Sequence, residues 1–448
     1  MTRKNPKIFH AFLACMFFLP WLGFMEGVSL AMAPIQRVVL PNKMVLLLSE
    51  EHSLPFITFQ LVIDAGSRKD PSGKEGLANL VARGILLGTS RRKATAINEE
   101  LDSMGAILDA SCGRDYTALT FRVLKKDLDR GMDLFLEALT QPTFPEEETR
   151  REVEKTLAGI QASEDQPQEL AERKFQETLF PNNPYGHPVE GTKESLPRIR
   201  REEIVTFYRD FYHPNNSFLI VAGDITSEEM RAKLFPRLGK WPMGRVPEVS
   251  FEATIAKGPK TVKVDRPITQ ANIILGHGGV NRKNPDFYAL TLMNYILGGG
   301  GFSSRLMEEI RNKRGLAYGV ASFFEPGKYP GSFQVVLQTK NISAKEAISL
   351  SLQQMKQIRQ QLVTEKELDA AKKYLIGNFP MRLDTQAKMA NFLTQIEYYV
   401  LGLDYAEQYP KLIQSVTREE VLRVAKAYLH PENCILVVVA NLKEAGVE

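Results

Sequence analysis

The chain has 448 residues, of which 44% are hydrophobic and 25% are charged, and its formal net charge is +4 (57 basic minus 53 acidic residues). This composition is typical of globular proteins and excludes a largely disordered chain, a collagen-like repeat and a protein with many membrane spans. Basic and acidic residues are interleaved, as in Arg200-Arg201-Glu202-Glu203. That pattern is typical of solvated helix faces and does not indicate a nucleic-acid partner.

The first residues predict a secretory signal peptide. Three basic residues lie between positions 3 and 7, an apolar run covers residues 8–25, and the small pair Ser29 and Ala31 follows. The predicted cut is after Ala31, which makes residues 1–31 the signal peptide. Two other interpretations stay open: an uncleaved membrane anchor, because the apolar run is long, and lipid attachment at Cys15.

The mature chain is expected to be soluble or peripheral, because no later stretch approaches the roughly 18 apolar residues that a membrane span requires. Only Cys112 and Cys434 remain after cleavage. In an exported protein these two could pair, but they fall in different halves of the chain, so we expect two buried thiols.

A long internal repeat organises the chain. His213-Pro214 matches His430-Pro431 at an offset of 217 residues (430 − 213 = 217), and Arg201 matches Arg418 at the same offset. Each copy predicts an amphipathic helix, a His-Pro-x-Asn turn and an apolar strand. A period of this length is too long for a solenoid and indicates duplication of a whole domain.

The repeat extends backwards more loosely. Strands are predicted over residues 116–123 and 332–339, each followed by a helix, at 127–139 and 344–362. Because adjacent strands and long helices mix without a strict βαβ rhythm, the fold class is α+β with largely antiparallel sheets. The predicted domains are 32–240 and 261–448, joined by a linker over residues 241–260.

Several motifs together carry a resemblance to a known family. The segment 76–89 (GLANLVARGILLGT) resembles the G-L-A-H-x-x-E-H pattern of the pitrilysin/insulinase-type zinc peptidases, the M16 family. Further matching pieces lie at residues 65–68, 163–167, 185–188 and 223–224 in the first half, and at 297–300, 303–306 and 311–318 in the second half. The resemblance covers nearly all of the chain after the signal. It implies two homologous α+β halves that form a clam shell around an unfolded peptide.

The zinc site that this resemblance implies is absent. In the family, two His at i and i+4 and a distant Glu bind Zn²⁺, and a Glu beside the second His removes a proton from the bound water. Asn79 and Arg83 stand at the two His positions, Ala82 at the Glu position and Gly159 at the distant ligand position. These residues are poor or impossible ligands, so we expect no catalytic residue, no metal site and no cofactor in this chain.

Other family positions are kept. Arg311 and Tyr318 match an Arg and a Tyr that reach into the active site from the second half, where they can donate hydrogen bonds to a peptide carbonyl or an oxyanion. Gly299 and Gly300 match glycine-rich segments associated with peptide capture. A solvated Arg, a Tyr that opens a strand and a tight glycine turn are the structural alternatives.

Residues 105–111, which include Asp109 and Ala110, resemble the family's edge strand that pairs with substrate. The family usually has Asn where Asp109 stands, which puts substrate pairing in doubt. An ordinary sheet strand is the alternative interpretation.

Three functions follow from these residues. The first is a non-catalytic M16-like subunit that binds unfolded peptide and completes, through Arg311 and Tyr318, the active site of a homologous zinc-bearing partner in a heteromeric peptidase. The second is a peptide-binding or structural scaffold with no catalytic complex. The third, an independently active zinc peptidase, is disfavoured by the four replaced positions. The signal peptide predicts export, to the periplasm if the source is a Gram-negative bacterium.

Export has a direct test. We expect the mature protein to begin near Met32 or Pro34, because a cut after Ala31 fits the small-residue rule and a cut after Ala33 is the second choice. Amino-terminal sequencing of the protein from its native host checks this. Met1 on a soluble cytoplasmic protein would contradict it.

Overall fold

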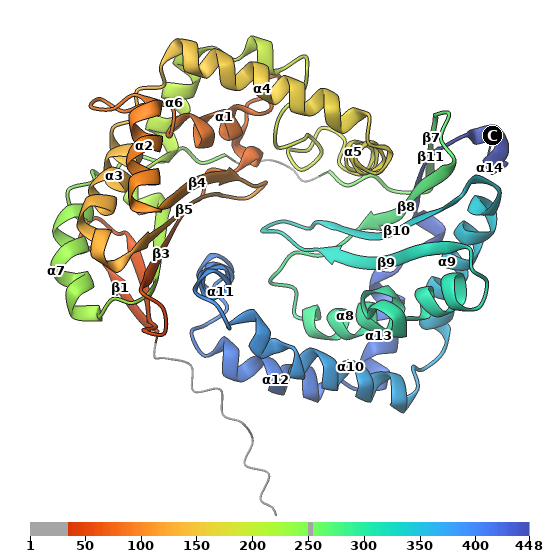
Figure 1. Cartoon of the computed structure of the whole chain (residues 1–448). Coiled ribbons are helices and arrows are strands. Elements are labelled where there is room, and N and C mark those ends of the chain that lie inside the picture. Colours follow the sequence, from red (N-terminus) through yellow and green to blue (C-terminus); the bar gives the residue numbers. More distant parts are fainter. Residues whose placement is uncertain (1–34, 250–253, 448) are drawn as a thin grey trace, which may run out of the picture. The chain divides into compact units, whose positions relative to one another are not determined.

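The computed structural model of the protein describes residues 35–249 and 254–447. The predicted signal peptide, Cys15 and the cleavage site at Ala31 lie outside these residues. The described chain is an α+β fold in which two β-sheets pack against helices (Figure 1). This confirms the fold class predicted from the repeat.

The first sheet has six strands in the order β1-β2-β6-β3-β5-β4. Neighbouring strands are antiparallel except the parallel pair β2 and β6. The strand bounds are β1 (Gln36–Val39), β2 (Val45–Glu50), β3 (Phe56–Ile63), β4 (Ile107–Cys112), β5 (Thr117–Leu124) and β6 (Ser217–Gly223). The helices of this half are α1 (Leu77–Gly84), α2 (Ala94–Met104), α3 (Leu128–Thr140), α4 (Glu146–Glu164), α5 (Pro167–Leu179), α6 (Arg201–Phe211) and α7 (Ser227–Leu238).

The second sheet has five strands in the order β7-β11-β8-β10-β9, with β7 and β11 parallel and the other pairs antiparallel. Its strands are β7 (Lys260–Asp265), β8 (Gln270–Gly278), β9 (Ala317–Glu325), β10 (Ser332–Lys340) and β11 (Ile435–Ala440). The helices of this half are α8 (Phe287–Asn294), α9 (Ala344–Gln360), α10 (Glu365–Gly377), α11 (Gln386–Tyr399), α12 (Tyr405–Ser415), α13 (Arg418–Tyr428) and α14 (Leu442–Ala445).

The two halves repeat one topology. The order β2-β6-β3-β5-β4 corresponds strand by strand to β7-β11-β8-β10-β9. The matching arginines also form equivalent hydrogen bonds. Arg201 Nε donates to Phe144 O at 2.7 Å, and Arg418 Nε donates to Val363 O at 2.6 Å. Each bond ties one helix to the loop before another, so the sequence repeat is a structural duplication.

One helix from each half packs on the sheet of the other half. Helix α5 contacts β8 and β11 of the second sheet, and α11 contacts β3 and β6 of the first. Phe175 of α5 is fully buried over Gly276, where an added Cβ would come within 2.5 Å of the Phe175 ring. On the other side, Gln60 Nε2 of β3 donates to Thr394 Oγ1 of α11 at 2.8 Å. The two halves are therefore joined by an exchange of equivalent helices.

The helical structure is irregular around residues 295–312. Residues 295–299 and 307–312 are π-helical, in the segments η5 (Tyr295–Gly299) and η7 (Met307–Asn312), and a short 3₁₀ turn lies between them. Leu306 and Ile310 of this region are completely buried.

Two other expectations concern the cysteines and the linker. Cys112 and Cys434 are both free, as predicted, but only Cys434 is buried by its exposed area and Cys112 is half-buried. In the predicted linker, residues 242–249 and 254–259 contain no helix or strand. The domain boundaries themselves stay a prediction.

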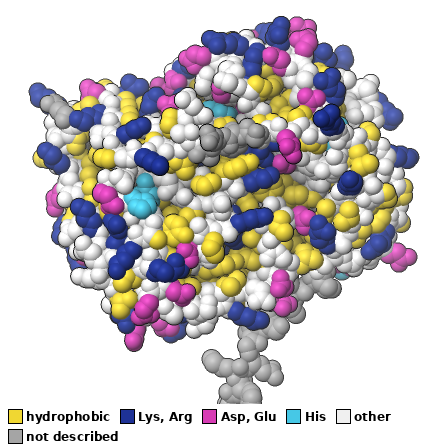
Figure 2. All heavy atoms as spheres, turned by 180° about the vertical axis from the view of Figure 1, so that it is seen from behind, with side chains coloured by type: hydrophobic (Ala, Val, Ile, Leu, Met, Phe, Trp, Pro, Cys, Tyr) yellow, Lys and Arg dark blue, Asp and Glu magenta, His cyan; other side chains and the backbone are white. Residues whose placement is uncertain are grey.

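The surface carries mixed charge. Figure 2 shows Lys and Arg side chains interspersed with Asp and Glu on one face of the molecule. Within residues 35–249 and 254–447, no helix combines the length and the apolar composition that crossing a membrane demands.

The His-Pro turn of the second half rests on a buried histidine. His277 Nδ1 lies 2.8 Å from Gly278 O, and His277 Nε2 accepts the His430 N–H at 3.1 Å. Because a carbonyl only accepts, Nδ1 carries the proton and the ring is neutral. The ring also stacks on Phe333, and burial lowers the pKa of His277 to about 4.

The low pKa of His277 predicts that the folded protein is less stable at acidic pH. Its pKa is lower in the folded protein than in the unfolded chain, so its stabilising contribution is complete above about pH 6.5 and is lost as the pH falls through about 4. We expect this single group to cost about 3 kcal/mol of unfolding free energy between pH 7 and pH 4. Denaturant unfolding at both pH values measures it.

The comparison is His277→Gln against the wild type. We expect the stability of the His277→Gln protein to depend less on pH than that of the wild type. Equal pH dependence in the two proteins would contradict the assignment.

Candidate functional site

Helix α1 carries three of the four replaced zinc-site positions. Its start is held by Asp70, whose carboxylate accepts the backbone N–H groups of Gly76 at 2.8 Å and Ala78 at 2.7 Å. The side chain of Asn79 is 4% exposed, and its Nδ2 has no hydrogen-bond partner within the described residues. Ala82 is fully buried and offers neither a base nor a ligand.

Arg83 lies opposite an acidic residue of α4. Its Nε is 3.6 Å from Glu152 Oε1, and Glu152 also has Lys155 Nζ at 3.5 Å from its second oxygen. The Glu152 side chain is 10% exposed, whereas that of Arg83 is 45% exposed. Two side-chain cations therefore compensate the carboxylate that lies nearest the replaced ligand positions.

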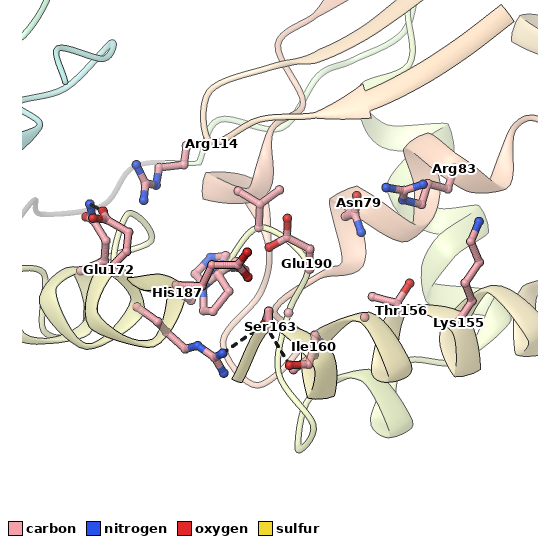
Figure 3. A pocket seen from close by; sticks show the side chains of 18 of the residues that line it. Asn79, Arg83, Arg114, Lys155, Thr156, Ile160, Ser163, Glu172, His187 and Glu190 are labelled. Carbon is pink, nitrogen blue, oxygen red and sulfur yellow. Dashed lines mark hydrogen bonds between the residues drawn. The ribbon is translucent and has the colours of Figure 1, made fainter. Parts of the chain in front are cut away.

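These residues line a cavity of about 660 Å³ between α1, α4, α5 and the loop of residues 186–191. Figure 3 shows Asn79 and Arg83 from α1, Thr156, Ile160 and Ser163 from α4, Glu172 from α5, and Arg114, His187 and Glu190 around the same space. Gly159 also lines it, and no atom lies within 4 Å of where a Cβ would be built there. The cavity is therefore present, but the residues at the ligand positions are not the family's zinc ligands.

Burial shifts the pKa values of two titratable groups of this cavity. Burial raises the pKa of Glu172, although Gln176 Nε2 at 2.6 Å and Gln334 Nε2 at 3.1 Å donate to it. Burial also lowers the pKa of His187, whose Nδ1 lies 2.9 Å from Pro188 O. The environment thus favours the neutral form of each group.

The residues present do not fit the zinc ion that the family resemblance implies. A zinc site requires neutral imidazole, thiolate or carboxylate donors, and Arg83 brings a cation instead. Within residues 35–249 and 254–447, no group of three or more His, Cys, Asp or Glu side chains is arranged to hold a metal.

The structure brings Arg311 and Tyr318 together at another place. The guanidinium carbon of Arg311 lies 5.2 Å from the ring centre of Tyr318 and 4.6 Å from that of Phe302. Tyr318 is 86% exposed and Phe302 is 68% exposed. Neither Arg311 nor Tyr318 lines the cavity between α1, α4 and α5. Sequence reasoning missed Phe302, for which an apolar residue after four glycines was the available signal.

Packing explains one of the two predicted glycines. An added Cβ at Gly300 would lie 2.7 Å from the backbone Tyr295 O, so its small size is required by the fold. Gly299 is exposed, and an added Cβ there would lie 2.7 Å from Asn294 Nδ2, the end of a side chain that can move. Peptide capture by these residues stays a prediction.

Asp109 and Ala110 lie in β4, which is the last strand of the first sheet. Asp109 is exposed and pairs with Thr120 of β5, and Ala110 is 4% exposed. The outer edge of β4 pairs with no other strand of the described sheet. The predicted edge strand is thus present, while its role stays a prediction.

Comparison with known proteins assigns the chain to a protein family. The insulinase pattern (peptidase family M16) matches residues 45–193, and the pattern described as the peptidase M16 inactive domain matches residues 198–375. The chain belongs to the M16 family.

Individual relatives agree with this assignment. An uncharacterized zinc protease of Rickettsia bellii is 27% identical over 380 residues, which cover 84% of this chain and 90% of that protein. The non-peptidase homolog YmxG of Helicobacter pylori is 26% identical over 430 residues, which cover 94% of this chain and 98% of that protein. The M16 inactive-domain structure from Pseudomonas fluorescens is 27% identical, covers 91% of this chain and 98% of its own, and has a TM-score of 0.85. A Helicobacter pylori protease structure has the same fold, with a TM-score of 0.82 at 21% identity over 91% of this chain and all of its own. With the replaced motif, these findings identify a non-catalytic M16-like protein.

The cavity generates a test of metal binding. We expect the purified mature chain to bind no stoichiometric zinc and to cleave no unfolded peptide, because Asn79, Arg83 and Gly159 supply no ligand set. Metal analysis after dialysis against dilute zinc measures the first point, and digestion of a reduced, unfolded protein measures the second.

A gain-of-ligand control sharpens this test. The triple substitution Asn79→His, Arg83→His and Gly159→Glu puts two imidazoles on one face of α1 and a carboxylate in open space on α4. We expect this variant to retain zinc under the same dialysis. One zinc per wild-type chain, with chelator-sensitive cleavage, would refute the expectation.

Proposed function

We propose that this protein binds unfolded peptide and completes the active site of a zinc-bearing partner peptidase through Arg311 and Tyr318. The observation that carries the proposal is the contact of the half-buried Arg311 with the exposed Tyr318, in a chain whose zinc-ligand positions are replaced. A residue kept only for packing has no reason to present a tyrosine that is 86% exposed next to an arginine.

The guanidinium of Arg311 is available for a ligand. Within the described residues, no carboxylate lies within 4.0 Å of it, although its neighbours Lys313 and Arg314 both pair with Glu309. Its contacts are instead the rings of Phe302 and Tyr318, which restrict its orientation by cation–π attraction. An oriented guanidinium and a phenol can both donate to a peptide carbonyl or to the oxyanion formed from it.

The free edge of β4 supports peptide binding. An extended peptide can add to such an edge through main-chain hydrogen bonds, which tolerate many sequences. Beside it, Ile107 is 60% exposed and offers an apolar contact. The exposed carboxylate of Asp109 would favour a basic side chain on the bound strand and disfavour an acidic one.

The proposal includes the partner and the compartment. The partner is a homologous subunit with an intact His-x-x-Glu-His motif, and zinc is bound there rather than in this chain. Some relatives are named zinc proteases, and those names describe those proteins. Export through the signal peptide places the complex outside the cytoplasm.

A second candidate is a scaffold that binds peptide without any catalytic complex. The observation that favours it is the glycine packing, because Gly300 is required by its contact with the backbone of Tyr295 rather than by a ligand. The two candidates differ in whether the Tyr318 hydroxyl affects turnover.

Tyr318→Phe tests the donor role. It removes one hydroxyl and keeps the ring on Arg311, so we expect kcat of the reconstituted complex on an unfolded peptide to fall by about 10²–10³. The thermal midpoint of this chain should not change, because the side chain is exposed. Tyr374→Phe, at a tyrosine that is 53% exposed on α10, is the matched control and should leave kcat unchanged.

Arg311→Lys extends the test. It keeps the charge but loses the planar group that stacks and donates in two directions, so turnover should also fall. If kcat of the Tyr318→Phe complex stays within about twofold of the wild type, the donor role fails and the scaffold becomes the better explanation. A sharply lower midpoint would instead make Tyr318 a structural residue.

A further inference from the structure

The second half contains a counterpart of the cavity that lost its zinc ligands. It has a volume of about 840 Å³ and is lined by α8, α11 and the start of α12, with Tyr116 from the first half. In the duplicated topology, α8 and α11 correspond to α1 and α5, which line the first cavity. Duplication therefore produced two cavities. The M16 resemblance assigns a function only to the first.

The charge of this second cavity is of one sign. Arg282, Arg382 and Lys388 line it, and among the described residues no Asp or Glu does. Lys388 is compensated by Asp384 at 2.8 Å, outside the cavity lining. The remaining excess of positive charge favours an anionic occupant.

Arg282 gives the strongest support for an anionic occupant. It is 9% exposed, and no carboxylate of the described residues lies within 4.0 Å of it. Its contacts are the Tyr405 hydroxyl, 2.8 Å from Nη2, a hydrogen bond to the Tyr288 side chain, and the face of the Phe287 ring, 3.7 Å from its guanidinium carbon. A buried charge without a counter-charge is costly, and a carboxylate would satisfy the donors that these contacts leave free.

The rest of the lining is aromatic with a few amides. Phe379 stacks on Tyr409 at 4.5 Å between ring centres, and Phe392 packs near Tyr405 at 6.0 Å. Tyr409 is 2% exposed, and its hydroxyl has no hydrogen-bond partner within the described residues. The amides of Asn391 and Gln395 also line the cavity.

We propose that this cavity binds the carboxyl-terminal end of a peptide whose last side chain is aromatic or large and aliphatic. The terminal carboxylate pairs with Arg282, and the side chain packs among Phe379, Phe392 and Tyr409. A fatty acid shares the carboxylate and the apolar body. The peptide is the better fit, because the Tyr409 hydroxyl and the Asn391 Nδ2 group can bond a peptide backbone but find no partner on an alkyl chain, whereas Asn391 Oδ1 already accepts from Gln60 and Gln395 already bonds Tyr116.

This inference goes beyond the proposed function, because it requires neither a partner peptidase nor Arg311 and Tyr318. The two can therefore fail separately. Binding is measured on the isolated mature chain, whereas the Tyr318 test requires the mixed complex.

The experiment uses fluorescence anisotropy with a synthetic peptide that is labelled at its amino terminus and ends in Phe with a free carboxylate. The same peptide with an amidated end is the first control. We expect the free acid to bind at least about tenfold more tightly, and Arg282→Gln to raise its Kd roughly ten- to a hundredfold. Arg266→Gln, at an exposed arginine outside the cavity, is the matched variant and should leave Kd unchanged.

Further variants separate binding from folding. Arg282→Lys keeps a cation and should restore part of the affinity, and Tyr409→Phe should weaken binding of the peptide without lowering the thermal midpoint. If Arg282→Gln lowers the midpoint and leaves Kd unchanged, the arginine is structural and the proposal is overturned. Equal binding of acid and amide overturns it as well.

Dodecanoate distinguishes the two sources of the carboxylate. We expect it to displace the peptide only at much higher concentration than an unlabelled copy of the peptide. If dodecanoate binds more tightly than the peptide and this binding depends on Arg282, the occupant is a fatty acid and the peptide assignment is wrong.

Discussion

The exchange of α5 and α11 between the two sheets is the constraint on which the rest of the structure depends. Each helix begins in one half and buries its apolar side on the sheet of the other (Figure 1). In α5, Leu170, Phe175 and Leu179 pack with Ile435 and Val437 of β11. Full burial of one such side chain contributes about 1.5–3 kcal/mol, so the exchanged helix stabilises a part of each sheet that the helices of its own half do not cover. The outward sides of the same two helices line the two cavities. Holding the halves together and shaping the cavities are thus done by the same elements.

A buried polar network fixes this exchange in one register. Arg68 is 2% exposed and pairs with Asp64, which Lys328 of the second half approaches to 3.2 Å and to which Tyr398 of α11 donates at 2.8 Å. Burial alone would raise the pKa of Asp64, but the cations of Arg68 and Lys328 hold it below its usual range. Buried ion pairs add little net stability, because desolvation offsets attraction. Their effect is specificity: a shifted α11 would remove the hydrogen bond that Tyr398 donates to Asp64.

Much of this fold could be predicted from the sequence, because the repeated elements can be recognised from local sequence patterns. The His-Pro turns and the apolar strands follow from patterns within about twenty residues, and the edge strand with Asp109 follows from the family resemblance. The exchange of helices could not be predicted. An amphipathic helix shows that it needs a sheet but not which of two similar sheets it covers. The replaced zinc ligands were visible by type and spacing, whereas the contact of Arg83 with Glu152 joins residues far apart in the chain. The second cavity was missed for the same reason, since its lining runs from Tyr116 to Tyr409.

The different chemistry of the two cavities comes from a few positions on the exchanged helices. Aligned from their first residues, α5 and α11 both keep a fully buried Ala, at 171 and 390, on the side that faces the sheet. On the cavity side, Glu169 corresponds to Lys388, Glu172 to Asn391 and Arg173 to Phe392. One sheet-facing position is therefore preserved, although the buried Phe175 corresponds to Thr394, while the cavity face changes from mixed charge to cationic and aromatic. Because a cavity wall contributes less to the core than a sheet contact does, its side chains can change with little effect on stability. A duplicated scaffold of this kind can lose its metal chemistry in one hollow and still offer a different binding surface in the other.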